Sequence, residues 1–175
     1  MKRLAALAVL AAALPALSSC GLRPLYGNGT QGVVARTIGT VQVDAIEGKA
    51  GWLVGNALNE RLAAISGGNG PNYRLHVELD DRITGFGVRS GDVVTRERRT
   101  LRARYQLFDG ATGALVMDAT AGSDAGLDVA SSEYATIAAE DTALERLSDI
   151  VADQIVMRMA QKLASEQGAA PPPAP

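Results

Sequence analysis

Arginine side chains are concentrated in residues 96–104, which contain five of them. If this segment is a strand, alternate residues share a face, and four of its arginines lie on one side over about 27 Å at ~3.4 Å per residue. These four, hereafter the arginine stripe, are Arg96, Arg98, Arg102 and Arg104. Because guanidinium groups match phosphate and carboxylate groups in bidentate fashion, the arginine stripe predicts a site for an anionic amphiphile or an acidic partner surface. The alternative is a solvated strand face whose arginines pair with Glu78, Asp80 or Asp118 on neighbouring strands.

Residue types that perform catalysis are sparse in this sequence. His76 is the only histidine and Cys20 the only cysteine, so neither type offers a pair of ligands for a metal. The adjacent carboxylates at 80–81 and 140–141 diverge, because neighbours point to opposite faces of a strand or about 100° apart on a helix. The sequence also lacks a G-x-S-x-G turn and a P-loop. We therefore expect a protein that is not an enzyme and that carries no cofactor and no metal.

The amino terminus has the pattern of a bacterial signal sequence. Lys2 and Arg3 precede an apolar run of eleven residues, from Leu4 to Leu14. That is the length of a signal-peptide core, whereas a membrane-spanning helix needs about 20 apolar residues. The segment Leu17-Ser18-Ser19-Cys20 resembles a lipobox. This resemblance implies a signal peptide at residues 1–19 and lipidation at Cys20; an ordinary secretory signal with an incidental cysteine is the alternative.

The remainder of the chain fits one domain. Removal of residues 1–19 takes away two of the 17 basic side chains and none of the 19 acidic ones, which leaves a net charge of −4. This acidic balance does not suggest a nucleic-acid partner. We predict a lipidated tether at residues 20–37, a single α+β domain at 38–165 and a disordered Pro/Ala tail at 166–175.

Apolar periodicity predicts four strands and two helices. We expect strands at residues 40–46, 73–88, 93–108 and 115–121, with a hairpin turn at 109–113. We expect one helix at 49–65 and a longer one from Ser131 or Ser132 to about Ala164. On the longer helix, Ile150 and Met157 are expected to widen the buried stripe. The predicted fold class is α+β, with two helices packed on one face of a four-stranded mixed sheet in the order β-α-β-β-β-α.

One aromatic side chain could act outside this core. Trp52 is the only tryptophan and lies near the start of the first predicted helix. We expect it to pack at the sheet edge. A role as an anchor at a membrane interface or on a partner is the alternative.

The segment that follows the predicted cleavage site resembles a known family. Residues 20–27, Cys-Gly-Leu-Arg-Pro-Leu-Tyr-Gly, are similar to the start of the lipopolysaccharide-assembly lipoprotein family, LptE, in its alphaproteobacterial form. Residues 132–135 and 138–141 are also similar to the family pattern, and the layout of elements agrees over about residues 1–165. The Pro/Ala tail departs from that pattern.

The resemblance implies an outer-membrane lipoprotein, anchored on the periplasmic side. It implies a non-enzymatic plug and assembly partner inside a β-barrel lipopolysaccharide-assembly protein, which binds lipopolysaccharide on its way to the cell surface. It does not extend to individual arginines, so the role of the arginine stripe is a hypothesis. A structural or pilot lipoprotein of another complex, such as a secretin, is the alternative function. A periplasmic hydrolase is disfavoured, because no nucleophile–base pair is visible.

Overall fold

The computed structural model describes residues 40–65, 72–89, 93–129 and 132–169, and these form four strands and two helices. The elements are β1 (Thr40–Val43), α3 (Gly48–Ile65), β2 (Asn72–Arg89), β3 (Val93–Asp109), β4 (Leu115–Asp128) and α4 (Glu133–Ala169). The strands form one sheet in the order β1-β2-β3-β4, in which β1 and β2 are parallel and the other pairs antiparallel. The predicted α+β fold class, with a four-stranded mixed sheet and the order β-α-β-β-β-α, is confirmed.

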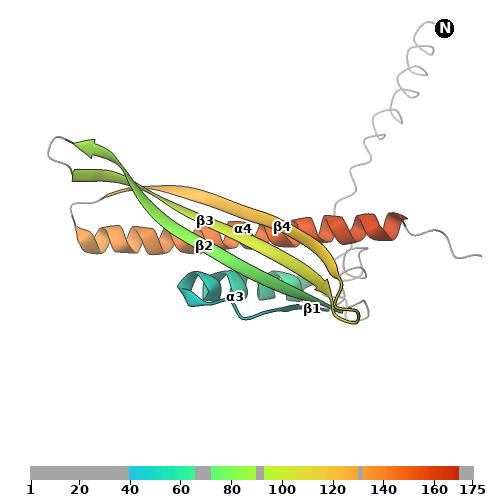
Figure 1. Cartoon of the computed structure of the whole chain (residues 1–175). Coiled ribbons are helices and arrows are strands. Elements are labelled where there is room, and N and C mark those ends of the chain that lie inside the picture. The colour runs from blue at the N-terminus through green and yellow to red at the C-terminus, as the bar shows by residue number, and fades with distance from the viewer. Residues whose placement is uncertain (1–39, 66–71, 90–92, 130–131, 170–175) are drawn as a thin grey trace, which may run out of the picture.

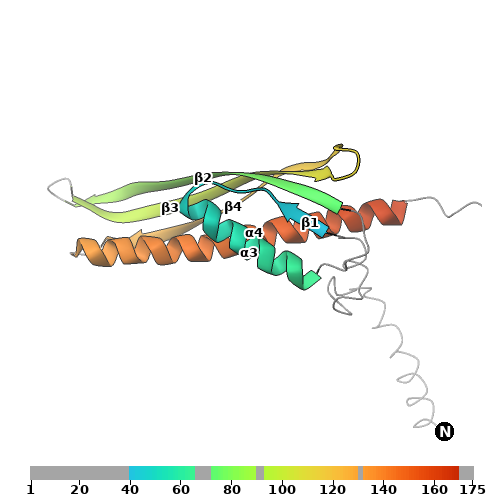
Figure 2. The same cartoon turned by 90° about the horizontal axis from the view of Figure 1, so that it is seen from below.

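Both helices lie on the same face of the sheet (Figures 1 and 2). Helix α4 runs along nearly the whole length of the sheet and contacts β3 and β4, whereas the shorter α3 contacts β1, β2 and α4. The end of the sheet that carries the β2–β3 connection extends beyond α3 (Figure 1). We call this the distal end, and the end with the β3–β4 turn the proximal end. The opposite face of the sheet carries no helix among the described residues.

The core follows the predicted alternation of apolar and polar residues. In β3 the buried apolar side chains are Leu101, Ala103, Tyr105 and Leu107, each at most 1% exposed. They meet the predicted stripe of α4, which is Leu144, Leu147, Val151, Ile155, Met159 and Leu163, also at most 1% exposed. Complete burial of a Val, Leu, Ile or Met side chain contributes about 1.5–3 kcal/mol. These facing stripes therefore fix which face of β3 is turned toward the helices.

The proximal turn forms at the predicted residues, 109–113. Asp109 accepts hydrogen bonds from the backbone N–H groups of Ala111 (3.0 Å) and Thr112 (2.7 Å) and from the Thr112 hydroxyl (2.8 Å). These hydrogen bonds lower the pKa of the Asp109 carboxyl, and those from Thr112 have the largest effect. Gly113 has a positive φ, in the left-handed region that glycine adopts without strain.

The sequence-based prediction was wrong at several boundaries and at two core positions. Strand β4 ends at Asp128 rather than 121, because its register with β3 continues unbroken from Gly122 to Asp128. Strand β1 ends at Val43, and α4 continues to Ala169, four residues into the segment predicted as tail. Ile150 and Met157 are 41% and 45% exposed, since they lie outside the face of α4 that meets the sheet and α3.

Four predicted features lie wholly or partly outside the described residues. The signal peptide, Cys20 and the tether fall outside the described residues, as does the tail from residue 170 onward. Ser132 directly precedes α4, and its backbone carbonyl accepts the bond from the Thr136 N–H (3.1 Å). In the part of the chain that the structure describes, neither helix has a stretch apolar and long enough to cross a membrane.

Candidate functional site

The arginine stripe lies on the open face of the sheet, opposite the helices. Arg96, Arg102 and Arg104 have side chains that are 65%, 52% and 58% exposed, and Arg98 is also exposed. Their neighbours in sequence, Leu101 and Ala103, point to the helix side and are buried. The structure thus brings all four predicted arginines onto one accessible strand face.

Strand β4 supplies most of the carboxylates that these arginines meet. Arg96 contacts Asp128 at 3.2 Å and Arg102 contacts Asp124 at 3.6 Å. Arg104 makes two bonds to Asp118, from Nη2 at 2.8 Å and from Nε at 3.2 Å. The alternative prediction, a solvated strand face, named Asp118 as a partner of these arginines, and the pair between Arg104 and Asp118 forms. The hydrogen bond from Arg104 has the largest effect among the interactions that lower the pKa of the Asp118 carboxyl.

The four arginines therefore differ in how far their charge is compensated. Arg104 is paired in bidentate fashion, whereas the Arg102 pair is the longest of the three ion pairs. Arg98 makes no ion pair among the described residues. Its guanidinium carbon instead lies 5.4 Å from the centroid of the Phe86 ring, within cation–π range. Arg98 and Arg102 are consequently the two arginines best able to bind an added anion.

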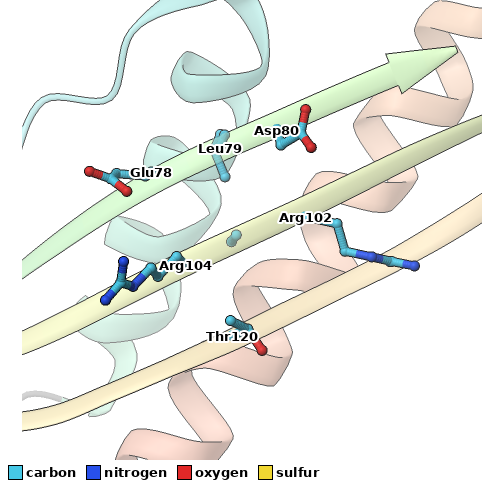
Figure 3. A pocket seen from close by; sticks show the side chains of 7 residues that line it. Glu78, Leu79, Asp80, Arg102, Arg104 and Thr120 are labelled. Carbon is cyan, nitrogen blue, oxygen red and sulfur yellow. The ribbon is translucent and has the colours of Figure 1, made fainter.

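A shallow hollow of about 460 Å³ lies on this face between β2 and β4. Glu78, Asp80, Arg102, Arg104 and Thr120 line it, together with Leu79 and Ala103 (Figure 3). Figure 3 shows the Arg102 side chain running across β4, away from Asp80. The hollow thus has carboxylates on its β2 side and guanidinium groups along β3.

Gly122 explains the direction that Arg102 takes. A Cβ atom at Gly122 would lie 2.5 Å from the Arg102 Cδ and 2.9 Å from the Leu101 carbonyl oxygen. Only a residue without a side chain therefore leaves room for the Arg102 stem to lie over β4 and reach Asp124.

Arg99, the fifth arginine of the segment, points to the helix side and was missed by the sequence-based reasoning. It is 8% exposed and donates from Nε to Asp81 Oδ1 (2.9 Å) and from Nη2 to Asp81 Oδ2 (2.5 Å). Its Nη1 donates to the backbone carbonyl of Glu140 in α4 (2.9 Å). Alternation in the strand already implied its inward direction, since Arg99 shares its parity with Leu101. Arg99 joins β2, β3 and α4 at the distal end.

The other polar residues singled out in the sequence include Asp80, Asp81 and His76, and each of them contacts a charged neighbour. Asp80 pairs with Arg82 on the open face (2.8 Å) while Asp81 pairs with Arg99 inside, so these neighbours diverge as expected. His76 lies 3.3 Å from Asp44 and 3.8 Å from Glu78. Among the described residues, His, Cys, Asp and Glu side chains form no group of three or more that could hold a metal ion.

Trp52 does not pack at the sheet edge. Its side chain is 66% exposed on α3, and the expectation of packing was therefore wrong. An exposed tryptophan on a helix that does not need it for the core is typical of a contact surface.

A family model and two solved structures match this chain. A family model described as lipopolysaccharide-assembly, LptE, matches residues 38–159. The chain is similar to a candidate lipoprotein from Caulobacter crescentus CB15, at 27% identity and a TM-score of 0.61, over 79% of this chain and 98% of the other. It is also similar to rare lipoprotein B from Shewanella oneidensis, at 10% identity and a TM-score of 0.58, over 73% and 97% of the two chains. The second likeness concerns the fold alone. None of the curated proteins compared with the chain matches it.

Proposed function

The chain belongs to the lipopolysaccharide-assembly family LptE, as its segment at residues 20–27 predicted. We propose that it is a non-enzymatic outer-membrane lipoprotein and that it binds lipopolysaccharide through the arginine stripe. In this proposal the domain is the plug and assembly partner of the β-barrel through which lipopolysaccharide reaches the cell surface. The observation that carries the proposal is a row of four arginines on a sheet face that neither helix covers.

The chemistry of this face suits an anionic amphiphile. Arg98 and Arg102 provide guanidinium groups that can bind phosphate in bidentate fashion. Phe86, 40% exposed, lies beside Arg98 and offers apolar surface next to that charge. Because the carboxylates of β4 already compensate Arg96 and Arg104, these two arginines contribute mainly to the orientation of an approaching ligand.

The anchor at Cys20 has a physical purpose in this proposal. Each acyl CH₂ that enters the membrane contributes about 0.8 kcal/mol, and a single chain gives only reversible binding. The three chains implied by lipobox processing would hold the domain permanently at the inner leaflet. The anchor would then keep the domain at a high effective concentration beside its barrel partner. Replacement of Cys20 by Ser should abolish incorporation of a labelled fatty acid and release the protein from the membrane fraction; retention in that fraction would contradict the anchor.

Charge reversal tests the ligand. Full-length lipoprotein in detergent, carrying Arg98→Glu and Arg102→Glu, should bind labelled lipopolysaccharide at least about tenfold more weakly than wild type, equivalent to ~1.4 kcal/mol. The matched control carries Lys49→Glu and Lys162→Glu, which change the net charge equally at exposed helix positions. This control should bind within about twofold of wild type. Unchanged lipopolysaccharide binding by the arginine variant would overturn the proposed role of the stripe.

Affinity purification tests the partner. The tagged lipoprotein, isolated from outer membranes, should bring down the β-barrel assembly protein. Recovery of a secretin in its place would support the pilot function and overturn the assignment to lipopolysaccharide export.

A further inference from the structure

The edge of the sheet formed by β4 is closed in its middle by side chains of α4. Gln154 donates from Nε2 to the Gly122 carbonyl (3.3 Å) and accepts from the Gly122 N–H at Oε1 (3.1 Å). Arg158 donates to the Thr120 carbonyl. These side chains occupy the backbone groups that an additional strand would otherwise use.

The same bonds establish which residues of β4 direct their backbone groups out of the sheet edge. Even-numbered residues direct their N–H and C=O groups away from β3, and the register is unbroken from Asp118 to Asp128. The bond from the Val129 N–H to the Thr95 carbonyl (3.0 Å) agrees, since odd-numbered positions face β3. The outward groups of Asp124, Gly126 and Asp128 have no hydrogen-bond partner within the described part of the chain. Among the described residues the distal part of this edge is therefore open.

A groove accompanies the open part of the edge. It has a volume of about 380 Å³ and lies between residues 125–127 of β4 and the start of α4. The α4 side chains that line it are Ala138, Ala139, Thr142, Ala143 and Arg146. Four of these five are too short to reach the backbone of β4 as Gln154 and Arg158 do. The same small side chains leave space for inward side chains of an added strand.

The charges around the edge define its occupant. The Asp124 and Asp128 side chains lie on the open face and are 51% and 85% exposed. Residues placed opposite them are therefore favoured when basic. Residues opposite Ala125 and Leu127 would face the groove and are favoured when apolar. We propose that residues 124–128 of β4 form a strand-addition site for an extended segment of a partner protein in which basic and apolar residues alternate.

The opposite edge differs in a way that supports this choice. Outward groups of β2 between Val77 and Gly85 also have no hydrogen-bond partner among the described residues. However, Asp81 points inward from that edge and is held by Arg99. An inward-pointing charge is a common protection of an edge strand against further pairing. The open part of β4 carries no such charge on its inward positions.

Peptide binding to the full-length lipoprotein in detergent tests the site without lipopolysaccharide, so its outcome is independent of the proposed function. The probe is a short labelled peptide of alternating lysine and valine, followed by fluorescence anisotropy. Two matched peptides serve as controls: one with glutamate in place of lysine, and one N-methylated on the backbone that would face β4. Both controls should bind at least about tenfold more weakly, equivalent to ~1.4 kcal/mol.

Variants locate the site on the molecule. Gly126→Pro removes one outward N–H without removing a bond to β3, as edge strands tolerate, and Ala138→Trp fills the groove from α4. Each should weaken binding of the lysine–valine peptide about tenfold or more. Gly85→Pro, the same change on the β2 edge, should leave binding unchanged. Circular dichroism identifies any variant that fails to fold, and Ala138→Trp then decides.

Three results would overturn the proposal. The first is equal binding of the lysine–valine and control peptides. The second is wild-type affinity in both Gly126→Pro and Ala138→Trp. The third is a dimer in the absence of peptide that Gly126→Pro dissociates, because the occupant would then be a second copy of this chain.

Discussion

Replacement of Arg99 by Met tests how the distal part of the sheet is fixed to α4. The change preserves much of the side-chain volume but removes the bidentate pair with Asp81 and the bond to the Glu140 carbonyl. Removal of one member of a buried ion pair destabilises a protein by about 3–5 kcal/mol, because the remaining charge is left buried. Here the Asp81 side chain keeps 23% exposure and can be partly hydrated. The expected loss therefore lies near the lower limit, ~3 kcal/mol.

Urea and thermal unfolding of the full-length lipoprotein measure this loss. For a domain of this size, ~3 kcal/mol corresponds to a fall in Tm of roughly 10 °C. Arg98→Met is the matched control, since Arg98 is the preceding residue and lies exposed on the opposite face; it should change stability by less than about 0.5 kcal/mol. The double variant Arg99→Met with Asp81→Leu should recover most of the loss, because it leaves no unpaired charge. A loss of stability below about 1 kcal/mol in Arg99→Met would refute this reasoning, because a broken buried ion pair costs about 3–5 kcal/mol. An equal loss of stability in Arg98→Met would refute it as well.

Three further substitutions address the packing of Arg102, the exposed tryptophan and the response to pH. Gly122→Ala should lower the free energy of unfolding by about 1–3 kcal/mol in urea, because the new Cβ displaces the Arg102 stem; unchanged stability would mean that the stem does not need this space. Trp52→Ala should change stability by less than about 0.5 kcal/mol but reduce recovery of the barrel partner in affinity purification, and full recovery would leave Trp52 without a contact role. Burial raises the pKa of Glu140, and the neighbouring Glu97 raises it further. The contribution of Glu140 to stability is therefore present below the ordinary carboxyl pKa and is lost as pH rises through the raised pKa. Glu140→Gln should therefore raise Tm at neutral pH and leave it unchanged in acid, and an equal rise at both pH values would contradict this assignment.

The parts of the fold that the sequence predicted are those where local pattern and tertiary packing agree. Strand β3 alternates strictly around Leu101, and α4 repeats its apolar residues at spacings of three and four. The Asp109–Gly113 turn carries its own hydrogen-bond chemistry. In β3 and α4 the apolar side of the local pattern is the side that the core buries.

The end of β4 could not be predicted because tertiary pairing determines it. Residues 122–128 contain two glycines, a serine and two aspartates, all of which have low strand propensity. They form a strand because β3 offers a long backbone ladder for them. This error affects the candidate site, since Asp124 and Asp128 lie beyond the predicted end of the strand at residue 121 and are therefore not among the predicted partners of Arg102 and Arg96.

The two faces of the sheet separate stability from recognition, and this makes charge reversal on the open face informative. The helix side contains the buried side chains of β3 together with Arg99, so changes there alter folding. The open face contains Arg98 and Arg102, which are exposed; the first makes no ion pair among the described residues and the second only a long one. Exposed ion pairs contribute about 0–1 kcal/mol to stability. A loss of ligand binding in the open-face variant, without a comparable loss of stability, therefore reports on recognition rather than on the fold.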